Sequence, residues 1–402
     1  MSTIETNSVA DLFFQLNWSS EMARHADAYA GLSVNFWRDL LPRRLKEEMT
    51  NKRTGDQFKL AFSPGELFTN GQARTIRRLS RTQFDPSRIG SKKLRPLPGR
   101  FYPKGLLRDV GGVFRANREP FRCVEVQNGH LDADMGHPLS GRQISLNVSV
   151  GAVSPKSEER GGGLKDWIET ISHGVGMQAR WMMRPTDFFS GSPYTRADES
   201  DDGLFYGKPR MVQHLDDTAL DMVRQLYARF IRKDMRVLDL MSSWDSHLPD
   251  GMAFKQVVGV GLNAYELEKN PVLSDRLVQD LNQDPILRFP DNHFDIAVCA
   301  VSIEYLSDPD TVFSEVVRTL RPGGLFMVVF SNRWFEPKVI AIWKELHEFE
   351  RMGLVLEYFI RTASFENIQT YSIRGLMRPS HDKYFRQLPY SDPVYAVWGT
   401  KR

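Results

Sequence analysis

The sequence has little of three features that would narrow its class at once: cysteine, long hydrophobic runs and net charge. Its two cysteines, Cys123 and Cys299, lie far apart along the chain. This excludes a disulfide framework and a Cys-x-x-Cys metal site. The longest apolar runs, such as 325–330, fall far short of the ~20 residues that a membrane-spanning helix needs. No basic segment followed by an apolar stretch opens the chain, so we expect no secretory signal and a cytoplasmic location.

The charges of the chain nearly cancel, since 53 Lys and Arg residues face 50 Asp and Glu residues. The net charge of +3 is too small to indicate a membrane or a nucleic acid as a general partner. Apolar residues, in contrast, are plentiful, at 41% of the 402 residues. This length and composition predict a globular protein of two or three domains.

The clearest boundary in the chain lies at residues 155–163, where charged residues are followed by glycines, as is typical of a linker. Before this boundary, alternating apolar residues predict strands at 58–62 and 144–150. Apolar residues at helical spacing predict one amphipathic helix over 36–49. The N-terminal half is therefore expected to have an α+β fold.

In the C-terminal half, strands alternate with helices. We expect helices over 210–232 and 336–352, and buried strands at 237–240, 257–260 and 294–298. This alternation predicts a parallel, doubly wound α/β sheet. Ligands of such sheets bind at the carboxyl ends of the strands, so the residues that follow each strand are the candidate site.

Several motifs follow these strands in order. They are VLDLMSSWDSHLP from Val237, VVGVGLN from Val257, QDLN from Gln279, FDIAVCAVSIEYL from Phe294 and LRPGGL from Leu320. Their order and spacing resemble the class I S-adenosylmethionine-dependent methyltransferases, particularly the type 11 group, over about residues 210–335. The resemblance implies a Rossmann-like fold that binds S-adenosylmethionine. It also implies that Asp280 lies near the adenine amino group and that Asp239 supports the methionine end of the donor.

Two positions depart from the pattern of that family. Where the family has glycines after the first strand, this chain has Met241, Ser243 and Asp245. Where the family has an acid that binds the ribose, this chain has Gly261. Neighbouring side chains can compensate by hydrogen bonding and stacking. The expected donor-binding residues are Asp239, Met241, Ser242, Ser243, Trp244, Asn263, Asp280, Leu281 and Ser302.

Methyl transfer often needs a base that removes a proton from the acceptor, and two histidines are candidates. His214 lies on the helix expected before the first strand, and His247 lies in the loop that should face the ligand. Each also has a structural interpretation, since His214 can be a surface residue and His247 can cap the next helix. Tyr305 and Trp334 can line an acceptor pocket or belong to the core or rim.

In the N-terminal half, residues 124–150 predict two strands, a loop with the sequence GHPLSG at 136–141 and a final strand. The helix expected over 36–49 is followed by a Gly-Asp turn at Gly55 and a further strand. These features resemble the SlyD-type FKBP peptidyl-prolyl isomerases over about residues 10–152. The resemblance implies an FKBP-like α+β domain that carries an insert.

Isomerisation in that family depends on an aromatic-lined cleft that desolvates the X-Pro bond. Phe36, Trp37, Phe62 and Tyr102 can line such a cleft or pack in the core. The acidic and aromatic stretch expected before the helix is absent, and Leu146 stands where an aromatic is expected. We therefore expect a peptide-binding or structural module with weak or no isomerase activity.

Eleven basic residues lie between Arg74 and Arg108, with Asp85 as the one acidic residue among them. No recognised binding motif accompanies them, so we interpret the stretch as a solvated flap or a surface for an acidic partner. A nucleic-acid patch is the alternative. His130 and His137 are too few for a metal cage, and we expect no metal.

These patterns together predict an FKBP-like domain at 1–154, a connector at 155–203 and a methyltransferase domain at 204–402. The leading hypothesis is an S-adenosylmethionine-dependent methyltransferase that acts on a small molecule. A peptide or protein client held by the FKBP-like domain is a further possible partner. The alternatives are a binding or chaperone protein with a degenerate donor pocket, and an active proline isomerase.

Overall fold

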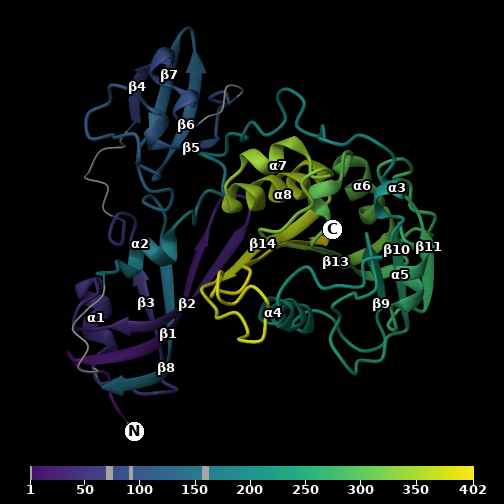
Figure 1. The fold of residues 1–402 in the computed structure, drawn as a ribbon, viewed down its shortest axis with the longest axis horizontal. Helices are drawn as coiled ribbons and strands as arrows, with labels where there is room; N and C mark the ends of the chain where they lie inside the picture. The colour runs from purple at the N-terminus through teal and green to yellow at the C-terminus, as the bar shows by residue number, and fades with distance from the viewer. Residues whose placement is uncertain (1, 69–75, 90–93, 156–162) are drawn as a thin grey trace. The chain divides into compact units, whose positions relative to one another are not determined.

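The computed structural model describes residues 2–68, 76–89, 94–155 and 163–402, which form two compact units (Figure 1). Unit 1 comprises Met1–Glu21, Ser33–Gly191 and Leu346–Leu354, and unit 2 comprises Met22–Leu32, Ser192–Glu345 and Val355–Arg402. The predicted linker at 155–163 lies almost entirely outside the described residues. The rest of the predicted connector is divided, since residues up to Gly191 belong to unit 1 and later ones to unit 2.

Unit 1 contains two antiparallel sheets. In the first, β8 pairs with β1 on one side and with β3 on the other, and alternate residues of β8 are buried. In the second, the strand order is β4-β7-β6-β5, and Phe121, Leu131 and Ala133 belong to its core. The strands are β1 (Ser8–Ser19), β3 (Gln57–Phe62), β4 (Ile76–Ser80), β5 (Phe101–Pro103), β6 (Pro120–Gln127), β7 (His130–Asp134) and β8 (Ile144–Pro155). The helices are α1 (Arg43–Met49) and α2 (Trp167–Ser172), with 3-10 turns at Arg81–Gln83, Pro86–Ile89 and Lys104–Leu106.

The helix predicted over 36–49 is shorter in the structure, because α1 begins only at Arg43. Pro42 occupies the position before it, and a residue that precedes a proline disfavours the helical conformation. Residues 35–39 instead form a turn in which the side chain of Asn35 accepts hydrogen bonds from the backbone of Trp37 and Arg38.

Unit 2 is built on a mixed sheet of the order β11-β10-β9-β12-β13-β15-β14-β2. The neighbours from β11 to β13 are parallel, whereas β15 is antiparallel to both β13 and β14. The strands are β2 (Arg24–Asn35), β9 (Arg236–Leu240), β10 (Gln256–Gly261), β11 (Asp275–Val278), β12 (Phe294–Ala300), β13 (Leu320–Phe330), β14 (Phe365–Arg374) and β15 (Val394–Lys401). The apolar runs of β9, β10 and β12 are buried, as expected for parallel strands covered on both faces.

The strand order of unit 2 reverses between β9 and β12. From β9 the chain proceeds outward through β10 to β11, and it then returns to pair β12 with the other side of β9. Figure 1 shows α4 on one face of this sheet and α6 on the other. The reversal creates the crevice in which doubly wound sheets bind ligands. The Rossmann-like, doubly wound sheet predicted for this half is therefore observed.

The helices of unit 2 differ in their limits from the prediction. They are α3 (Asp202–Tyr206), α4 (Asp217–Ala228), α5 (Ala264–Lys269), α6 (Pro309–Thr319) and α7 (Ala341–Glu345), with a 3-10 turn at Ile303–Tyr305. A further helix, α8 (Glu348–Thr362), belongs to unit 1 up to Leu354 and to unit 2 from Val355. In place of a helix over 210–232, α4 begins at Asp217, because the Asp216 side chain accepts the backbone N–H groups of Thr218 and Ala219 as its N-cap. In place of a single helix over 336–352, the chain forms α7 and α8 with a break at 346–347.

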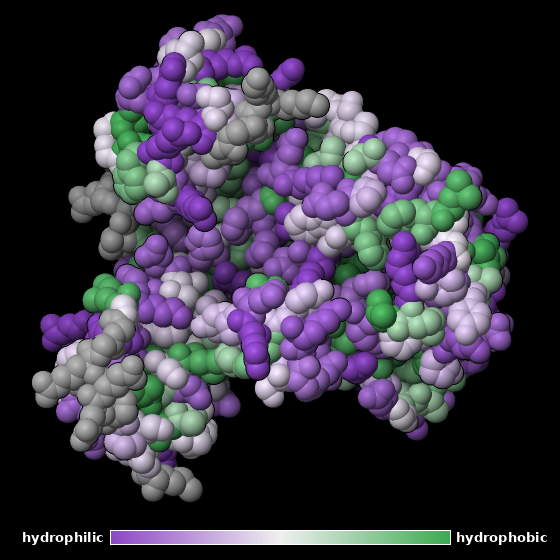
Figure 2. Space-filling model, in the orientation of Figure 1, coloured by the Kyte–Doolittle hydropathy of each residue, from purple (hydrophilic) through white to green (hydrophobic). Residues whose placement is uncertain are grey.

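The described residues include no helix long and apolar enough to cross a bilayer. On the face drawn in Figure 2, hydrophobic side chains are scattered among hydrophilic ones.

Candidate functional site

A pocket of about 460 Å³ lies at the strand-order reversal of unit 2. Its wall is made by the segments that follow β9, β10, β11 and β12, together with residues 202–216 and parts of 333–335 and 378–392. All of the predicted donor-binding residues and both predicted base candidates line it: Asp239, Met241, Ser242, Ser243, Trp244, Asn263, Asp280, Leu281, Ser302, His214 and His247. Tyr305 and Trp334 line it as well. The structure therefore brings together residues from His214 to Trp334, which are up to 120 positions apart in the sequence.

Asp239 organises the loop that follows β9. Its carboxylate accepts hydrogen bonds from the hydroxyls of Ser242 and Ser246, the latter at 2.6 Å. Burial raises the pKa of Asp239 to about 6, although both hydrogen bonds oppose the rise. Asp239 thus holds Ser242 and Ser246 of the β9–β10 loop in place through these two hydrogen bonds.

The loop after β9 contains no glycine at the positions where one was expected, and its backbone takes a left-handed conformation all the same. Met241 has φ 54° and His247 has φ 52°, and across the pocket Val301 has φ 47°. Such values are rare for residues other than glycine, and most of all for a β-branched residue such as valine. All three residues line the pocket, and strained backbone of this kind collects at functional sites.

Gly261 ends β10 because no side chain fits there. A Cβ atom at this position would collide with the carbonyl oxygen of Ser242. The backbone of the β9–β10 loop thus leaves no room for a side chain, acidic or otherwise, at position 261. This close approach explains why the expected acid is missing.

A carboxylate reaches the same region from the next helix. Glu266 of α5 lines the pocket and accepts hydrogen bonds from the Ser243 hydroxyl and the Arg210 backbone N–H, both at 2.6 Å. Asn263, whose contact with the ligand stays a prediction, lines the pocket, caps α5 through the Glu266 N–H and donates to the Tyr206 carbonyl. The sequence analysis missed Glu266, although its position five residues after Gly261 was the available signal.

Asp280 follows β11 and presents an unsatisfied acceptor. One carboxylate oxygen accepts the Asn282 N–H at 2.9 Å. The other, Oδ2, is buried and has no hydrogen-bond partner among the residues that the structure describes. Burial raises the pKa of this carboxyl group. A buried acceptor without a partner is costly, so this oxygen suits a ligand that donates a hydrogen bond.

His247 and Asp245 form a pair on the β9–β10 loop. The His247 Nδ1 atom lies 3.1 Å from the Asp245 carboxylate, although the alignment is not that of a hydrogen bond. Burial raises the pKa of Asp245, but contacts with His247 and Gln213 outweigh burial, so its pKa lies below the ordinary range. Of the two interpretations of His247, the helix cap is wrong, because a loop without a helix joins β9 to β10.

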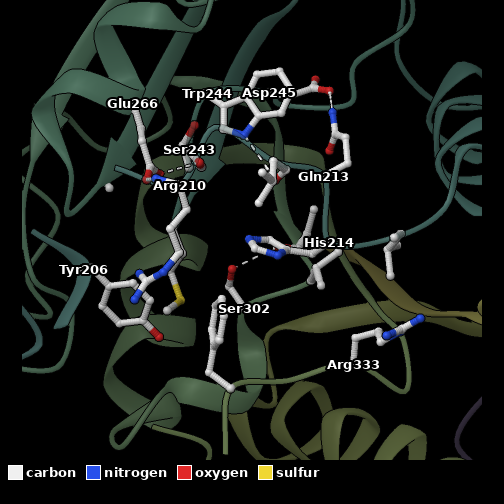
Figure 3. Close-up of a pocket in the computed structure, with 18 of the residues that line it drawn as sticks. Tyr206, Arg210, Gln213, His214, Ser243, Trp244, Asp245, Glu266, Ser302 and Arg333 are labelled. Carbon is white, nitrogen blue, oxygen red and sulfur yellow. Dashed lines mark hydrogen bonds between the residues drawn. The ribbon is translucent and has the colours of Figure 1, made fainter. Parts of the chain in front are cut away.

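His214 lies in the loop between α3 and α4, and not on a helix as predicted, because α4 begins only at Asp217. Figure 3 shows its ring pointing into the middle of the pocket, among Arg210, Trp244 and Ser302. Its side chain remains accessible through the pocket opening.

Aromatic side chains form the wall near α3. Tyr206, Tyr305 and Phe335 pack against one another with ring centroids 6.1–6.3 Å apart. The Arg210 guanidinium lies 5.1 Å from the centre of the Phe335 ring. The sequence analysis included Tyr305 in this wall but missed Tyr206, Arg210 and Phe335.

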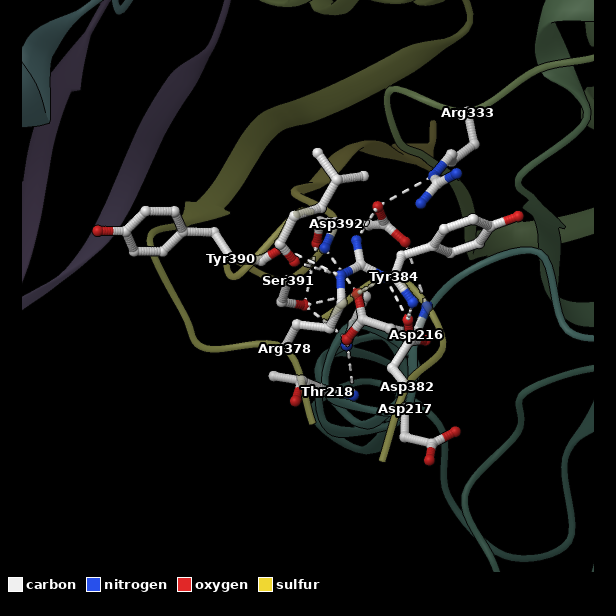
Figure 4. A network of polar contacts seen from close by, with 12 residues as sticks. Asp216, Asp217, Thr218, Arg333, Arg378, Asp382, Tyr384, Tyr390, Ser391 and Asp392 are labelled. Atoms are coloured by element: carbon white, nitrogen blue, oxygen red, sulfur yellow. Dashed lines mark hydrogen bonds and ion pairs between the residues drawn. The ribbon is translucent and has the colours of Figure 1, made fainter. Parts of the chain in front are cut away.

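A buried ionic network closes the opposite side of the pocket (Figure 4). Arg378 lies 2.7 Å from Asp392 and 3.5 Å from Asp216, and Arg333 contacts the same Asp392 at 3.0 Å. The Ser391 hydroxyl also contacts Asp216 at 2.9 Å. The network fixes the start of α4 to the segment that precedes β15.

Unit 1 contains a second cavity, of about 530 Å³, which apolar and charged side chains line together. Leu40, Leu41, Phe68 and Met135 line it together with the predicted His137-Pro138 loop. The aromatics expected to line a cleft do not border it: Phe36, Phe62 and Tyr102 are buried elsewhere, and Trp37 is exposed. His137 stacks on Phe68, with ring centroids 3.9 Å apart, and burial lowers its pKa to about 4.

The basic stretch of unit 1 is partly paired. Arg78 forms an ion pair with Asp132 at 2.9 Å, and Lys104 forms one with Glu119 at 2.8 Å. Arg100 is buried beside Glu350 at 3.3 Å. Residues 74, 92 and 93 of this stretch lie outside the described residues.

Comparison with known proteins identifies a methyltransferase domain, of the type 11 family, over residues 246–328. The ubiquinone/menaquinone biosynthesis C-methyltransferase UbiE of Psychromonas ingrahamii is 26% identical over 24% of this chain and 49% of its own length. UbiE of Laribacter hongkongensis is 32% identical over 24% of this chain and 38% of its own. The chain therefore spans half or less of the length of these two relatives.

Among solved structures, a SAM dependent methyltransferase from Archaeoglobus fulgidus covers 45% of this chain and 94% of its own, with 14% identity and a TM-score of 0.33. The matched family lies within the half of the chain for which the sequence predicted a methyltransferase, and it supports S-adenosylmethionine as the cofactor. Residues 246–328 of the chain therefore carry a methyltransferase domain.

Proposed function

We propose that the protein is a methyltransferase that uses S-adenosylmethionine and that the pocket of unit 2 binds this donor. The observation that carries the proposal is the carboxyl group of Asp280, which lines a pocket at the reversal point of the sheet and whose Oδ2 atom has no hydrogen-bond partner among the described residues. Two strained residues, Met241 and Val301, face the same pocket. Such strain costs roughly 1–3 kcal/mol per residue and persists where function requires it.

The residues of the pocket fit the parts of the donor. Asp280 Oδ2 would accept the adenine amino group, with Leu281 beside it as apolar surface. Glu266 and Ser243 would bind the ribose hydroxyls in place of the acid that Gly261 excludes. When bound, the donor supplies a methyl group on a positively charged sulfur, which suits a pocket rich in carboxylates.

Other predicted residues have supporting roles in this proposal. Asp239 and Ser242 hold the loop that carries Met241 toward the donor, and Asn263 holds the backbone at Tyr206. Trp244 and Ser302 offer a ring and a hydroxyl to the pocket, as Figure 3 shows. His214 and His247 are the candidates for the base.

We further propose that the methyl acceptor is a small molecule. A cavity of about 460 Å³ is of the size that small ligands occupy. The names of the two UbiE relatives refer to C-methylation in quinone biosynthesis, which is also small-molecule chemistry.

Calorimetric titration of the full chain with S-adenosylmethionine and with S-adenosylhomocysteine tests the proposal. We expect both to bind and to raise the unfolding temperature, since a ligand at 100 times its dissociation constant adds about 2.7 kcal/mol of stability. Failure of both to bind at millimolar concentration would support the alternative, a binding or chaperone protein with a degenerate donor pocket.

For unit 1 we propose an FKBP-like module, with boundaries near residues 1–154, that binds apolar peptides with little or no isomerase activity. The cavity bordered by the His137-Pro138 loop supports peptide binding. The cavity lacks the aromatic wall that desolvation of an X-Pro bond would require, since Phe36, Phe62 and Tyr102 lie elsewhere. A proline-limited refolding assay with the full chain should show no acceleration, whereas clear acceleration would favour an active isomerase.

A further inference from the structure

The loop that carries His214 is held at both of its ends. On one side, the Arg210 backbone N–H donates to Glu266 at 2.6 Å. On the other side, Asp216 caps α4 and is held by the buried Arg378 and by Ser391 (Figure 4). Catalytic groups act efficiently when their positions are fixed before the reaction. The ring of His214 therefore projects into the pocket from an anchored segment.

The ring nitrogens of His214 are available to a ligand. Within the described part of the chain, neither nitrogen has a hydrogen-bond partner, and the ring contacts the edge of Phe335 at a centroid distance of 5.2 Å. His247 differs, since its Nδ1 atom faces Asp245 at 3.1 Å and its side chain is buried. Of the two histidines, His214 is thus the one with both nitrogens free.

The surroundings of His214 favour its neutral form. Partial burial lowers its pKa, Glu266 of α5 opposes this change, and Arg210 and His247 add to it. The charged residues across the pocket include Arg333, which Figure 3 shows, and Asp382, Lys383 and Asp392. A neutral imidazole at neutral pH can accept a proton.

We propose that His214 is the base that takes a proton from the methyl acceptor, and that the acceptor reacts through an acidic hydroxyl group, such as that of a phenol or an enol. This inference rests on the proposed methyltransferase function. A weakly basic imidazole deprotonates a phenol or an enol far more readily than an aliphatic alcohol, because proton transfer is efficient when the two pKa values are close. The aromatic rings of Trp244 and Phe335 line the pocket beside His214, and a planar acceptor can pack against them.

The transfer balances as follows. The hydroxyl proton passes to a ring nitrogen of His214, and the electron pair left on the acceptor forms the new bond to the methyl carbon. As this bond forms, the carbon–sulfur bond of the donor breaks and sulfur keeps its electron pair. The protonated imidazole then releases its proton to solvent through the pocket opening. No oxidant or reductant is required.

The test uses para-nitrophenol as the probe, because its absorption reports directly whether its hydroxyl is ionised. The full chain is saturated with S-adenosylhomocysteine, and the phenol is titrated with pH in wild type and in His214→Gln. In wild type we expect the apparent pKa of the bound phenol to fall by about one unit, because the proton moves to a nearby base and the resulting charges attract. In His214→Gln we expect the shift to disappear.

His293→Gln is the matched control. His293 immediately precedes β12, at the amino end of the strand and away from the pocket at the carboxyl ends, and its Nε2 atom lies 2.9 Å from the Gln256 Oε1 atom. This variant should show the wild-type shift. A phenol that does not bind, or that ionises equally in wild type and His214→Gln, would overturn the inference.

Binding of S-adenosylhomocysteine separates this inference from the function on which it rests. The donor product should bind His214→Gln within about threefold of wild type, because its proposed contacts are Glu266 and Asp280. Normal binding of this product without any phenol shift would refute His214 as the base while the methyltransferase proposal stands. If S-adenosylhomocysteine does not bind even the wild-type protein, the methyltransferase proposal itself is refuted.

Discussion

The two cavities of the protein have similar volumes but differ in the polar groups that line them. The cavity of unit 2, about 460 Å³, has carboxylates, an unpartnered buried oxygen and strained backbone in its wall. The cavity of unit 1, about 530 Å³, is lined by apolar side chains such as Leu40, Leu41 and Phe68 and by charged ones, of which Lys104 and Glu119 form an ion pair. Volume alone therefore does not separate a reactive site from a binding site.

The difference lies in the groups that are left unsatisfied. Apolar side chains of a cavity stabilise a complex with any ligand that removes their surface from water. Such contacts therefore discriminate weakly among ligands. A cavity with a buried unpartnered acceptor such as Asp280 Oδ2 gains most from a ligand with a matching donor. We therefore expect the cavity of unit 2 to bind a narrow range of ligands and the cavity of unit 1 to bind apolar ligands of varied structure.

The largest effect is expected at Gly261. In Gly261→Ala the new methyl group meets the Ser242 carbonyl, so the β9–β10 loop must move. We expect donor binding to be lost and the free energy of unfolding to fall by about 1–3 kcal/mol, as for overpacked sites. Calorimetry and urea denaturation measure the two effects. Gly141→Ala, where an added Cβ meets open space, is the control and should change neither.

The next effect concerns the charge of Asp239. Its pKa is raised to about 6, so the folded state holds the proton more tightly than the unfolded state, and burial of the charged form costs stability as the pH rises through that value. Asp239→Asn removes this cost. The quantity to compare is the free energy of unfolding of Asp239→Asn minus that of wild type. We expect this difference to rise by about 3 kcal/mol from about pH 4 to about pH 7.5. Urea denaturation at both pH values measures it, and a pH-independent difference would contradict the assignment of a buried, titrating Asp239.

Glu266→Gln should weaken donor binding by about 10- to 100-fold, because hydrogen bonds to a charged group contribute about 1.5–3 kcal/mol. Glu268→Gln lies on the same helix and is exposed, so it serves as the matched control. Equal affinities of S-adenosylhomocysteine for the two variants would show that Glu266 does not replace the acid missing at Gly261.

In unit 1 the expected effect is smaller. Leu40 lines the cavity and is 49% exposed, so Leu40→Ser removes part of the binding surface without opening the core. We expect about fivefold weaker binding of a dansyl-labelled Ala-Leu-Pro-Phe peptide, as fluorescence titration would show. Leu164→Ser, also exposed but outside the cavity, should bind as wild type does. Equal affinities of the two variants would argue against this cavity as the peptide site.

The sheet of unit 2 and the membership of its pocket could be predicted from the sequence. Buried apolar runs fix the parallel strands, and the carboxyl ends of such strands meet at one edge, so Asp239, Asn263 and Asp280 were expected to lie together. The roles of individual side chains could not be predicted in the same way. Asn263 is used to cap α5, because its neighbours Glu266 and Tyr206 offer partners that only the folded chain brings near.

The periodicity of apolar residues also did not predict where the helices begin and end. The apolar spacing of residues 210–232 continues through His214, but the Asp216 cap starts α4 three residues after it. This difference matters for function, because a helix would have fixed His214 on its surface, whereas the loop directs the ring into the pocket. Glu266 was missed because its role depends on the close approach of Ser242 to Gly261, which is a backbone contact without a sequence motif.

Photo-crosslinking of radiolabelled S-adenosylmethionine to the full chain, followed by mass spectrometry of the peptides, tests the central claim most directly. The account predicts label in residues 239–247 and 261–282, the two segments that line the donor end of the pocket, and loss of the label in Gly261→Ala. Label confined to unit 1, or label that Gly261→Ala leaves unchanged, would contradict it.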